Sequence, residues 1–293
     1  MNRILSTIIA IPLILMGSFT NIFAAEVDTL ANIPDELIAR KLKKHDASLA
    51  ISAEAVLHKL KQNQEFTLVD VRGRQDFERL SIPGAVNIGL YAVKTKTYLK
   101  SAPIVLVNEG FRYAELEDES KRLAQHGFKV SILDGGLPAW QRQGGRLTGD
   151  FFALDEMKSV SAPVFFREKD YETTLVVDIS PTRSDASSKL LPYALHLPEL
   201  DSNPASEAGF RKVFARRQKS PFQSVVIFNE TGAQYDKTQK YLSRMGIDAF
   251  ILQGGLAAYQ KYLAGLLLSW KPRNSRMKTV SNCRPCGEGA EEE

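Results

Sequence analysis

The chain contains an internal repeat. Four short blocks of its first half return in its second half, in the same order. The blocks are 67–71 (TLVDV), 82–85 (IPGA), 104–112 (IVLVNEGFR) and 132–140 (ILDGGLPAW), and their counterparts are 174–179 (TLVVDI), 191–194 (LPYA), 226–234 (VIFNETGAQ) and 251–259 (ILQGGLAAY). Chance could produce one such pair, but four pairs in register predict two copies of one domain.

Within the first copy, segments typical of strands alternate with segments typical of helices. Short apolar runs rich in β-branched residues predict strands, and apolar residues at steps of three and four predict helices. The strands are predicted at 66–71, 85–88, 104–107 and 130–133, and the helices at 52–62 and 115–125. This alternation favours a parallel sheet flanked by helices. We therefore predict an α/β protein with tandem domains at 50–148 and 165–268, joined by a linker at 149–164.

The N-terminal segment has the features of a secretory signal peptide. A short positive start at Asn2 and Arg3 precedes an apolar stretch at 4–16 and a small-residue cleavage site near residue 24. The apolar stretch is shorter than the roughly 20 residues that a membrane-spanning helix needs. We therefore predict that residues 1–25 are removed on export to a periplasm or extracellular space, with no membrane span afterwards; an uncleaved anchor is the alternative. Residues 26–49 place apolar side chains at helical spacing, which predicts a lead-in helix packed on the first domain.

The composition excludes several classes of protein. With 38 Lys and Arg against 34 Asp and Glu, the formal net charge is +4, which gives no electrostatic case for a nucleic-acid partner. The four histidines are scattered without the spacing of metal ligands, so neither a metal nor another cofactor is predicted. The only cysteines are Cys283 and Cys286, so both predicted domains lack a thiol.

The motifs of the first copy resemble those of the rhodanese domain, and the duplication resembles the tandem rhodaneses. The resemblance rests on Asp-Val-Arg at 70–72, Ile-Pro-Gly-Ala at 82–85, a strand that enters a glycine-containing loop and helix at 104–125, and Asp-Gly-Gly at 134–136 before Trp140. It covers about residues 50–265 and is more specific in the first copy. It implies a loop cysteine, ringed by backbone N–H groups at a helix N-terminus, that takes sulfur from an anionic donor as a persulfide. An Arg a few residues further on holds the anion in that family.

The position that corresponds to the family's cysteine carries no nucleophile in either copy. Alignment through the preceding strand places Asn108 there in the first copy and Asn229 in the second; a shift by one would place Val107 there instead. An amide or an alkyl side chain cannot carry sulfane sulfur. Asn is also a favoured turn and capping residue, so both residues have a purely structural interpretation.

The remaining residues that would form an anion site or pocket are altered unevenly between the copies. They are Asp70, Arg72, Glu109, Arg112, Asp178, Glu230 and Gln234. Glu109 and Glu230 place a carboxylate where an anion would enter, which weakens the attraction for thiosulfate-like donors. Arg112 matches the family's anion-holding Arg, whereas Gln234 takes its place in the second copy. The structural interpretation of the two aspartates is that they fix a turn or pair with an Arg.

The C-terminal segment, residues 269–293, holds the remaining candidate for sulfur chemistry. Cys283 and Cys286 form a Cys-x-x-Cys motif between a basic stretch and an acidic end. This spacing is found in redox and sulfur-carrying proteins, but no helix that would activate a thiol is predicted beside it. A plain disulfide formed after export is the structural alternative.

Two functions follow from these observations. The first is an exported, catalytically degenerate tandem rhodanese-like protein that binds a protein or small molecule through its clefts or its inter-domain surface. The alternative is a sulfurtransferase or thiol-disulfide protein in which Cys283 or Cys286 replaces the missing loop cysteine. A phosphatase on the related fold would need the same absent cysteine.

Overall fold

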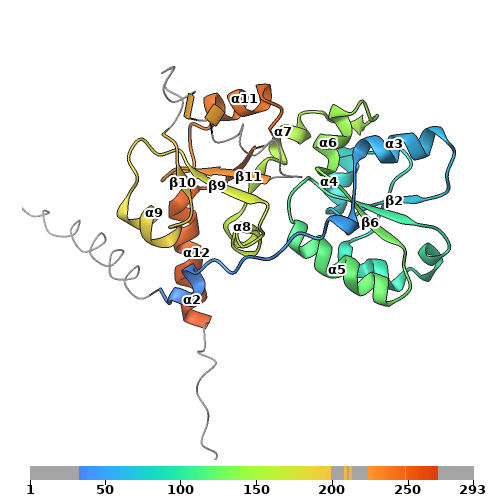
Figure 1. The fold of residues 1–293 in the computed structure, drawn as a ribbon, viewed down its shortest axis with the longest axis horizontal. Helices are drawn as coiled ribbons and strands as arrows, with labels where there is room; N and C mark the ends of the chain where they lie inside the picture. Colours follow the sequence, from blue (N-terminus) through green and yellow to red (C-terminus); the bar gives the residue numbers. More distant parts are fainter. Residues whose placement is uncertain (1–32, 199–207, 210, 213–223, 248, 270–293) are drawn as a thin grey trace, which may run out of the picture.

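The computed structural model of the chain describes residues 33–198, 208–209, 211–212, 224–247 and 249–269. Within them the chain forms two α/β units that lie side by side (Figure 1). The predicted signal peptide and the C-terminal segment with Cys283 and Cys286 lie outside the described residues.

Each unit is built on a five-stranded sheet in which all paired strands are parallel. The first sheet has the order β1 (Ala50–Ile51), β6 (Val130–Leu133), β5 (Ile104–Val107), β2 (Thr67–Asp70), β4 (Val86–Asn87). The second has the order β8 (Ser159–Val160), β12 (Ala249–Leu252), β11 (Ser224–Phe228), β9 (Thr174–Asp178), β10 (Leu195–His196). Since the repeated sequence blocks occupy matching places in both orders, the two domains have the same topology.

Helices cover the faces of both sheets (Figure 1). In chain order they are α2 (Asp35–Ile38), α3 (Ala53–Lys61), α4 (Arg74–Arg79), α5 (Tyr113–Gln125), α6 (Gly136–Arg142), α7 (Ala153–Glu156), α8 (Ala162–Glu168), α9 (Asp185–Leu190), α11 (Asp236–Arg244) and α12 (Gly255–Ser269). Short 3-10 turns lie at η1 (Ala47–Leu49), η2 (Leu90–Thr95) and η3 (Thr97–Lys100), and β3 (Leu80–Ser81) pairs antiparallel with β7 (Thr148–Gly149). The helix predicted from residue 52 begins as expected, because the Ser52 hydroxyl accepts a hydrogen bond of 3.1 Å from the Ala55 N–H.

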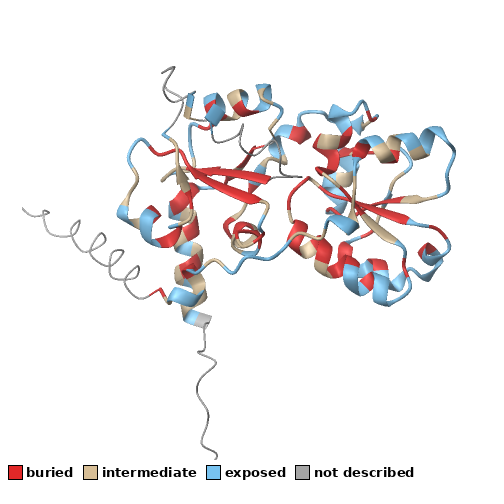
Figure 2. Cartoon of the chain, in the orientation of Figure 1, coloured by how far each residue is buried: buried red, intermediate tan, exposed pale blue. Residues whose placement is uncertain are grey.

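The central strands form the core of each domain, and Figure 2 shows them as buried. Successive side chains of a strand point to opposite faces of the sheet. In the first domain Val69 and Leu106 accordingly belong to one apolar cluster, whereas Leu68 and Val105 belong to the other. Burial on both faces explains why the strands are continuous apolar runs.

The prediction of a lead-in helix over 26–49 is wrong for its described part. Residues 33–49, here called the N-terminal strap, form only the four-residue α2 and then run extended to η1. The Arg40 guanidinium donates to the carbonyls of Lys169, Tyr171 and Thr174 at 2.8–3.1 Å. The backbone of the strap also bonds to the second domain at Lys43, so bonds to distant backbone replace those of a helix. The strap therefore starts in the second domain, where Ile33 and Ile38 join the core, and crosses to the first (Figure 1).

The segment 149–164, predicted as a linker, is divided between the two domains. Ala153 and Leu154 pack in the core of the first domain. Val160 lies in β8, which forms an edge of the second sheet. The domains therefore meet near residue 158 without a free connection, because the apolar residues of the segment are buried on either side.

Candidate functional site

The loop between β5 and α5 holds its own backbone through Asn108. The Asn108 side chain is buried, with Oδ1 accepting a hydrogen bond of 2.9 Å from the Gly110 N–H and Nδ2 donating to the Phe111 carbonyl. Both ends of the amide are thus engaged within the loop. Val107, the alternative occupant of the cysteine position, is the last residue of β5, and its side chain lies in the core.

The loop between β11 and α11 repeats this arrangement. Asn229 Oδ1 accepts from the Gly232 N–H at 2.7 Å, and Nδ2 donates to the Ala233 carbonyl at 2.6 Å. Each loop then passes through a left-handed residue, Arg112 with φ 53° or Gln234 with φ 63°. Both loops are therefore held by an Asn amide, and the second loop has one more residue between the Asn and the left-handed residue.

Gly136 packs closely against the backbone of the first loop, and Gly255 packs in the same way against the second. A Cβ atom on Gly136 would lie 2.4 Å from the Gly110 nitrogen, and one on Gly255 would lie 2.4 Å from the Gly232 nitrogen. Both glycines also have positive φ, at 54° and 61°. Only glycine can occupy these positions without moving the loop.

The Arg of the first loop is already paired with a carboxylate. Arg112 Nε lies 2.7 Å from Glu109 Oε1, and Nη2 lies 2.9 Å from Oε2. These bonds raise the pKa of Arg112, and its charge is compensated at short range. In the second loop Gln234 is exposed and uncharged, and the half-buried Glu230 has an Oε1 atom without a hydrogen-bond partner.

The aspartates at the strand ends form structural contacts. Asp70 is buried and holds Arg72 through Nε at 3.0 Å and Nη2 at 2.6 Å, while the same Nη2 donates to the Leu80 carbonyl at 2.6 Å. The pair thereby ties the end of β2 to the start of β3.

In the second domain Asp178 fixes a turn instead. It accepts hydrogen bonds from the Ser180 N–H at 2.9 Å and from the Ser187 hydroxyl. Arg183 makes the contact that corresponds to the one between Arg72 and a backbone carbonyl in the first domain. Its Nη2 donates to the Leu191 carbonyl at 2.9 Å. The sequence comparison missed Arg183 because it follows Asp178 by five positions, whereas Arg72 follows Asp70 by two.

A pocket of about 420 Å³ lies where the first loop meets the second domain. Its lining includes Arg72, Gly73, Asp76, Arg79, Glu109, Phe111, Arg112, Ala153, Glu156, Met157, Ser159, Val160, Ser161, Val164 and Gln253. Three arginines therefore face three carboxylates. Arg72 is paired with Asp70, Arg112 with Glu109, and Arg79 with Asp150 and Glu156. The pocket is balanced in charge and gives no general attraction to anions.

The second domain covers the first loop directly. The Phe111 side chain is only 1% exposed and belongs to the core of the second domain, where its ring lies 4.9 Å from that of Phe250. Glu168 of α8 accepts hydrogen bonds from the Ala114 and Glu115 N–H groups at the start of α5. Sequence analysis missed the roles of Phe111 and Glu168, because their partners are remote in the chain. Within the described ranges, no group of three or more His, Cys, Asp and Glu residues could hold a metal ion.

Comparison with known proteins identifies the first domain. Residues 52–143 match the family model described as Rhodanese-like domain. They are therefore a rhodanese-like domain. No curated protein gives a significant match. In the described part of the chain, no helix is long and apolar enough to cross a membrane.

Several solved structures are similar to parts of the chain. The BH2092 protein from Bacillus halodurans shares 25% identity over 36% of this chain and 79% of its own, with a TM-score of 0.32. The Alr3790 protein from Anabaena sp. shares 27% identity over 36% of this chain and 87% of its own, with a TM-score of 0.31. A thiosulfate sulfurtransferase from Pseudomonas aeruginosa covers 81% of this chain and 68% of its own at 11% identity, with a TM-score of 0.30.

Proposed function

We propose that this chain is an exported tandem rhodanese-like protein whose loops do not transfer sulfur, and that it binds a protein or small-molecule partner in the pocket between its domains. The observation that carries the proposal is the pair of loop asparagines. Asn108 and Asn229 stand where the resemblance places a cysteine, and each uses its amide to hold the loop's own backbone. Neither side chain can form a persulfide.

The electrostatics of the pocket support the same proposal. A thiosulfate-like donor needs an uncompensated cation or a row of free N–H groups. The Arg112 guanidinium is paired with Glu109, and the Gly110 N–H is taken by Asn108. A ligand of this pocket therefore has to satisfy arginines and carboxylates together, which favours a partner that carries both signs of charge.

Export rests on the features of residues 1–25, and the second rhodanese-like domain rests on the repeated blocks and the shared sheet topology. The alternative is sulfur transfer through Cys283 or Cys286, which lie outside the described part of the chain. An assay of variants of these two cysteines distinguishes this alternative from the proposal.

A calorimetric titration of thiosulfate into the full chain tests the proposal. We expect no saturable binding, because the cations of the pocket are compensated. The Glu109→Gln variant frees Arg112 and should gain weak binding, while the control Glu54→Gln, at an exposed position on α3, should behave like the parent. Saturable binding of thiosulfate by the parent protein would overturn the argument from charge.

A further inference from the structure

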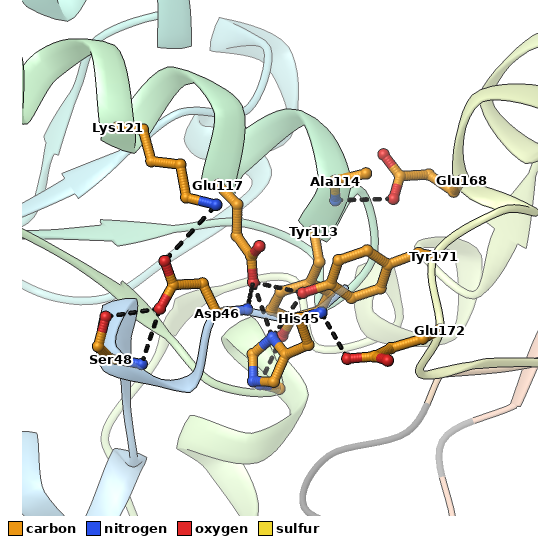
Figure 3. Close-up of polar contacts among 11 residues, drawn as sticks. His45, Asp46, Ser48, Tyr113, Ala114, Glu117, Lys121, Glu168, Tyr171 and Glu172 are labelled. Carbon is orange, nitrogen blue, oxygen red and sulfur yellow. Dashed lines mark hydrogen bonds and ion pairs between the residues drawn. The ribbon is translucent and has the colours of Figure 1, made fainter. Parts of the chain in front are cut away.

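A carboxylate of the second domain caps a helix of the first (Figure 3). Glu168, the last residue of α8, is only 2% exposed. Its Oε2 accepts a hydrogen bond of 2.9 Å from the Ala114 N–H, and its Oε1 one of 3.4 Å from the Glu115 N–H. These N–H groups begin the 13-residue helix α5, whose N-terminus carries partial positive charge. The contact joins the two domains directly behind the first loop.

No cation of the described residues forms an ion pair with this buried carboxylate, and three of the nearby cations are paired with other carboxylates. Lys43 is bound to Asp118, Arg112 to Glu109, and Arg122 to Glu119. The charged and titratable groups around Glu168 are Lys43 and His45 of the N-terminal strap, Tyr91 of η2, Arg112 of the loop, Glu115, Glu117, Asp118 and Arg122 of α5, Arg167 of α8, and Tyr171. The carboxylate is thus desolvated, and its charge is balanced by hydrogen bonds from two backbone N–H groups and by a weaker attraction from Lys43.

A second polar cluster lies beside this contact, and one oxygen of its carboxylate has several hydrogen-bond partners (Figure 3). His45 Nδ1 lies 2.7 Å from Glu117 Oε1 and 2.6 Å from the Tyr171 hydroxyl, and the Tyr171 hydroxyl donates to Glu117. The Asp46 N–H donates to the same oxygen at 3.1 Å. Glu117 therefore has several donors at close range, whereas Glu168 has the weaker set. The negative charge of Glu168 is therefore less compensated than that of Glu117.

We propose that Glu168 is a proton-controlled latch between the two domains: the closed joint binds a proton at this carboxyl group, and loss of that proton weakens the joint. The proposal does not depend on the function proposed above. Burial is the largest effect on this group, and it raises the pKa of Glu168 to about 7, against the hydrogen bonds from Ala114 and Glu115. When the joint opens, water reaches the carboxyl group and its pKa returns toward the ~4.3 of an exposed Glu.

The sign of the pH dependence follows from this difference. A carboxyl group with a higher pKa in the closed state favours closure at low pH, and the favourable contribution is lost as the pH rises from the open-state value to the closed-state value. For the two values above, the closing equilibrium constant is roughly tenfold larger at pH 6 than at pH 8. Arg112 and Phe111, which line the pocket, immediately precede α5, so opening of the joint also opens the pocket.

Amide hydrogen exchange of the full chain tests the latch. After correction for intrinsic exchange rates, the protection of the Ala114 and Glu115 amides should fall about tenfold between pH 6 and pH 8. Glu168→Gln keeps the shape of the protonated side chain, so its protection should be the same at both pH values. Glu172→Gln is the matched control, because Glu172 is an exposed carboxylate of the same region and bonds the His45 N–H at 2.6 Å; it should follow the parent.

Protection that is equal at both pH values in the parent, or a pH slope that persists in Glu168→Gln, would overturn the latch. A second measurement needs no variant. A carbon-13 NMR titration of the Glu168 carboxyl group should give a pKa near 7, and an ordinary value near that of an exposed Glu would also overturn the proposal.

Discussion

Replacing Phe111 by Ala should uncouple the two domains. The ring is 1% exposed, packs at 4.9 Å and 41° on Phe250, and lies in the core of the second domain although its backbone belongs to the loop of the first. Truncation of a buried Phe costs about 3–5 kcal/mol, of which an aromatic pair accounts for about 0.5–1.5 kcal/mol. Because the lost contacts cross the domain boundary, the loss should fall mainly on the coupling between domains.

Urea denaturation followed by hydrogen exchange and mass spectrometry measures this effect for each domain separately. We expect the parent to unfold in one transition and Phe111→Ala to unfold in two. The control is Phe128→Ala, since Phe128 is also buried and its apolar cluster is formed mainly by residues of the first domain. That variant should lose comparable stability and keep a single transition. The reasoning is refuted if Phe111→Ala loses less than about 1 kcal/mol, or if it unfolds with the same transition shape as Phe128→Ala.

Two further predictions concern residues that the sequence singled out. Asp70→Asn leaves the buried Arg72 guanidinium without its counter-charge, so the free energy of unfolding should fall by about 3–5 kcal/mol in urea titrations; a loss below about 1 kcal/mol would show that the pair is not structural. Asn229→Cys should gain no transfer of sulfur from thiosulfate to cyanide, because Gln234 supplies no charge to hold the donor. Thiocyanate production by this variant above that of the parent would contradict this reading of the second loop.

The central strands could be predicted because their surroundings are uniform. Strands 104–107 and 130–133 have the predicted bounds, and for 104–107 the reason is that a parallel strand buried on both faces is a continuous apolar run. The start of α3 was equally predictable, because Ser52 caps it through a local hydrogen bond. Both features depend on neighbouring residues in the chain or on a uniform core.

The joint between the domains could not be predicted, since it depends on contacts between remote segments. The apolar spacing of residues 33–49 suggests a helix, but Arg40 and the strap backbone find their hydrogen bonds on the second domain. Phe111 lies in a repeated block and Glu168 in none, but the roles of both appear only when the two domains are placed side by side. The sequence therefore predicts the loop residues of the candidate site, but it does not predict the residues of the second domain that cover these loops.

The production of thiocyanate from thiosulfate and cyanide tests the central claim most directly, with the full chain compared with a Cys283→Ser, Cys286→Ser double variant. The account predicts that both proteins give the rate of the protein-free reaction, because Asn108 and Asn229 cannot carry sulfur. If the full chain turns over thiosulfate and the double variant does not, the C-terminal cysteines carry the activity. Turnover by both proteins would contradict the claim that the loops are inactive.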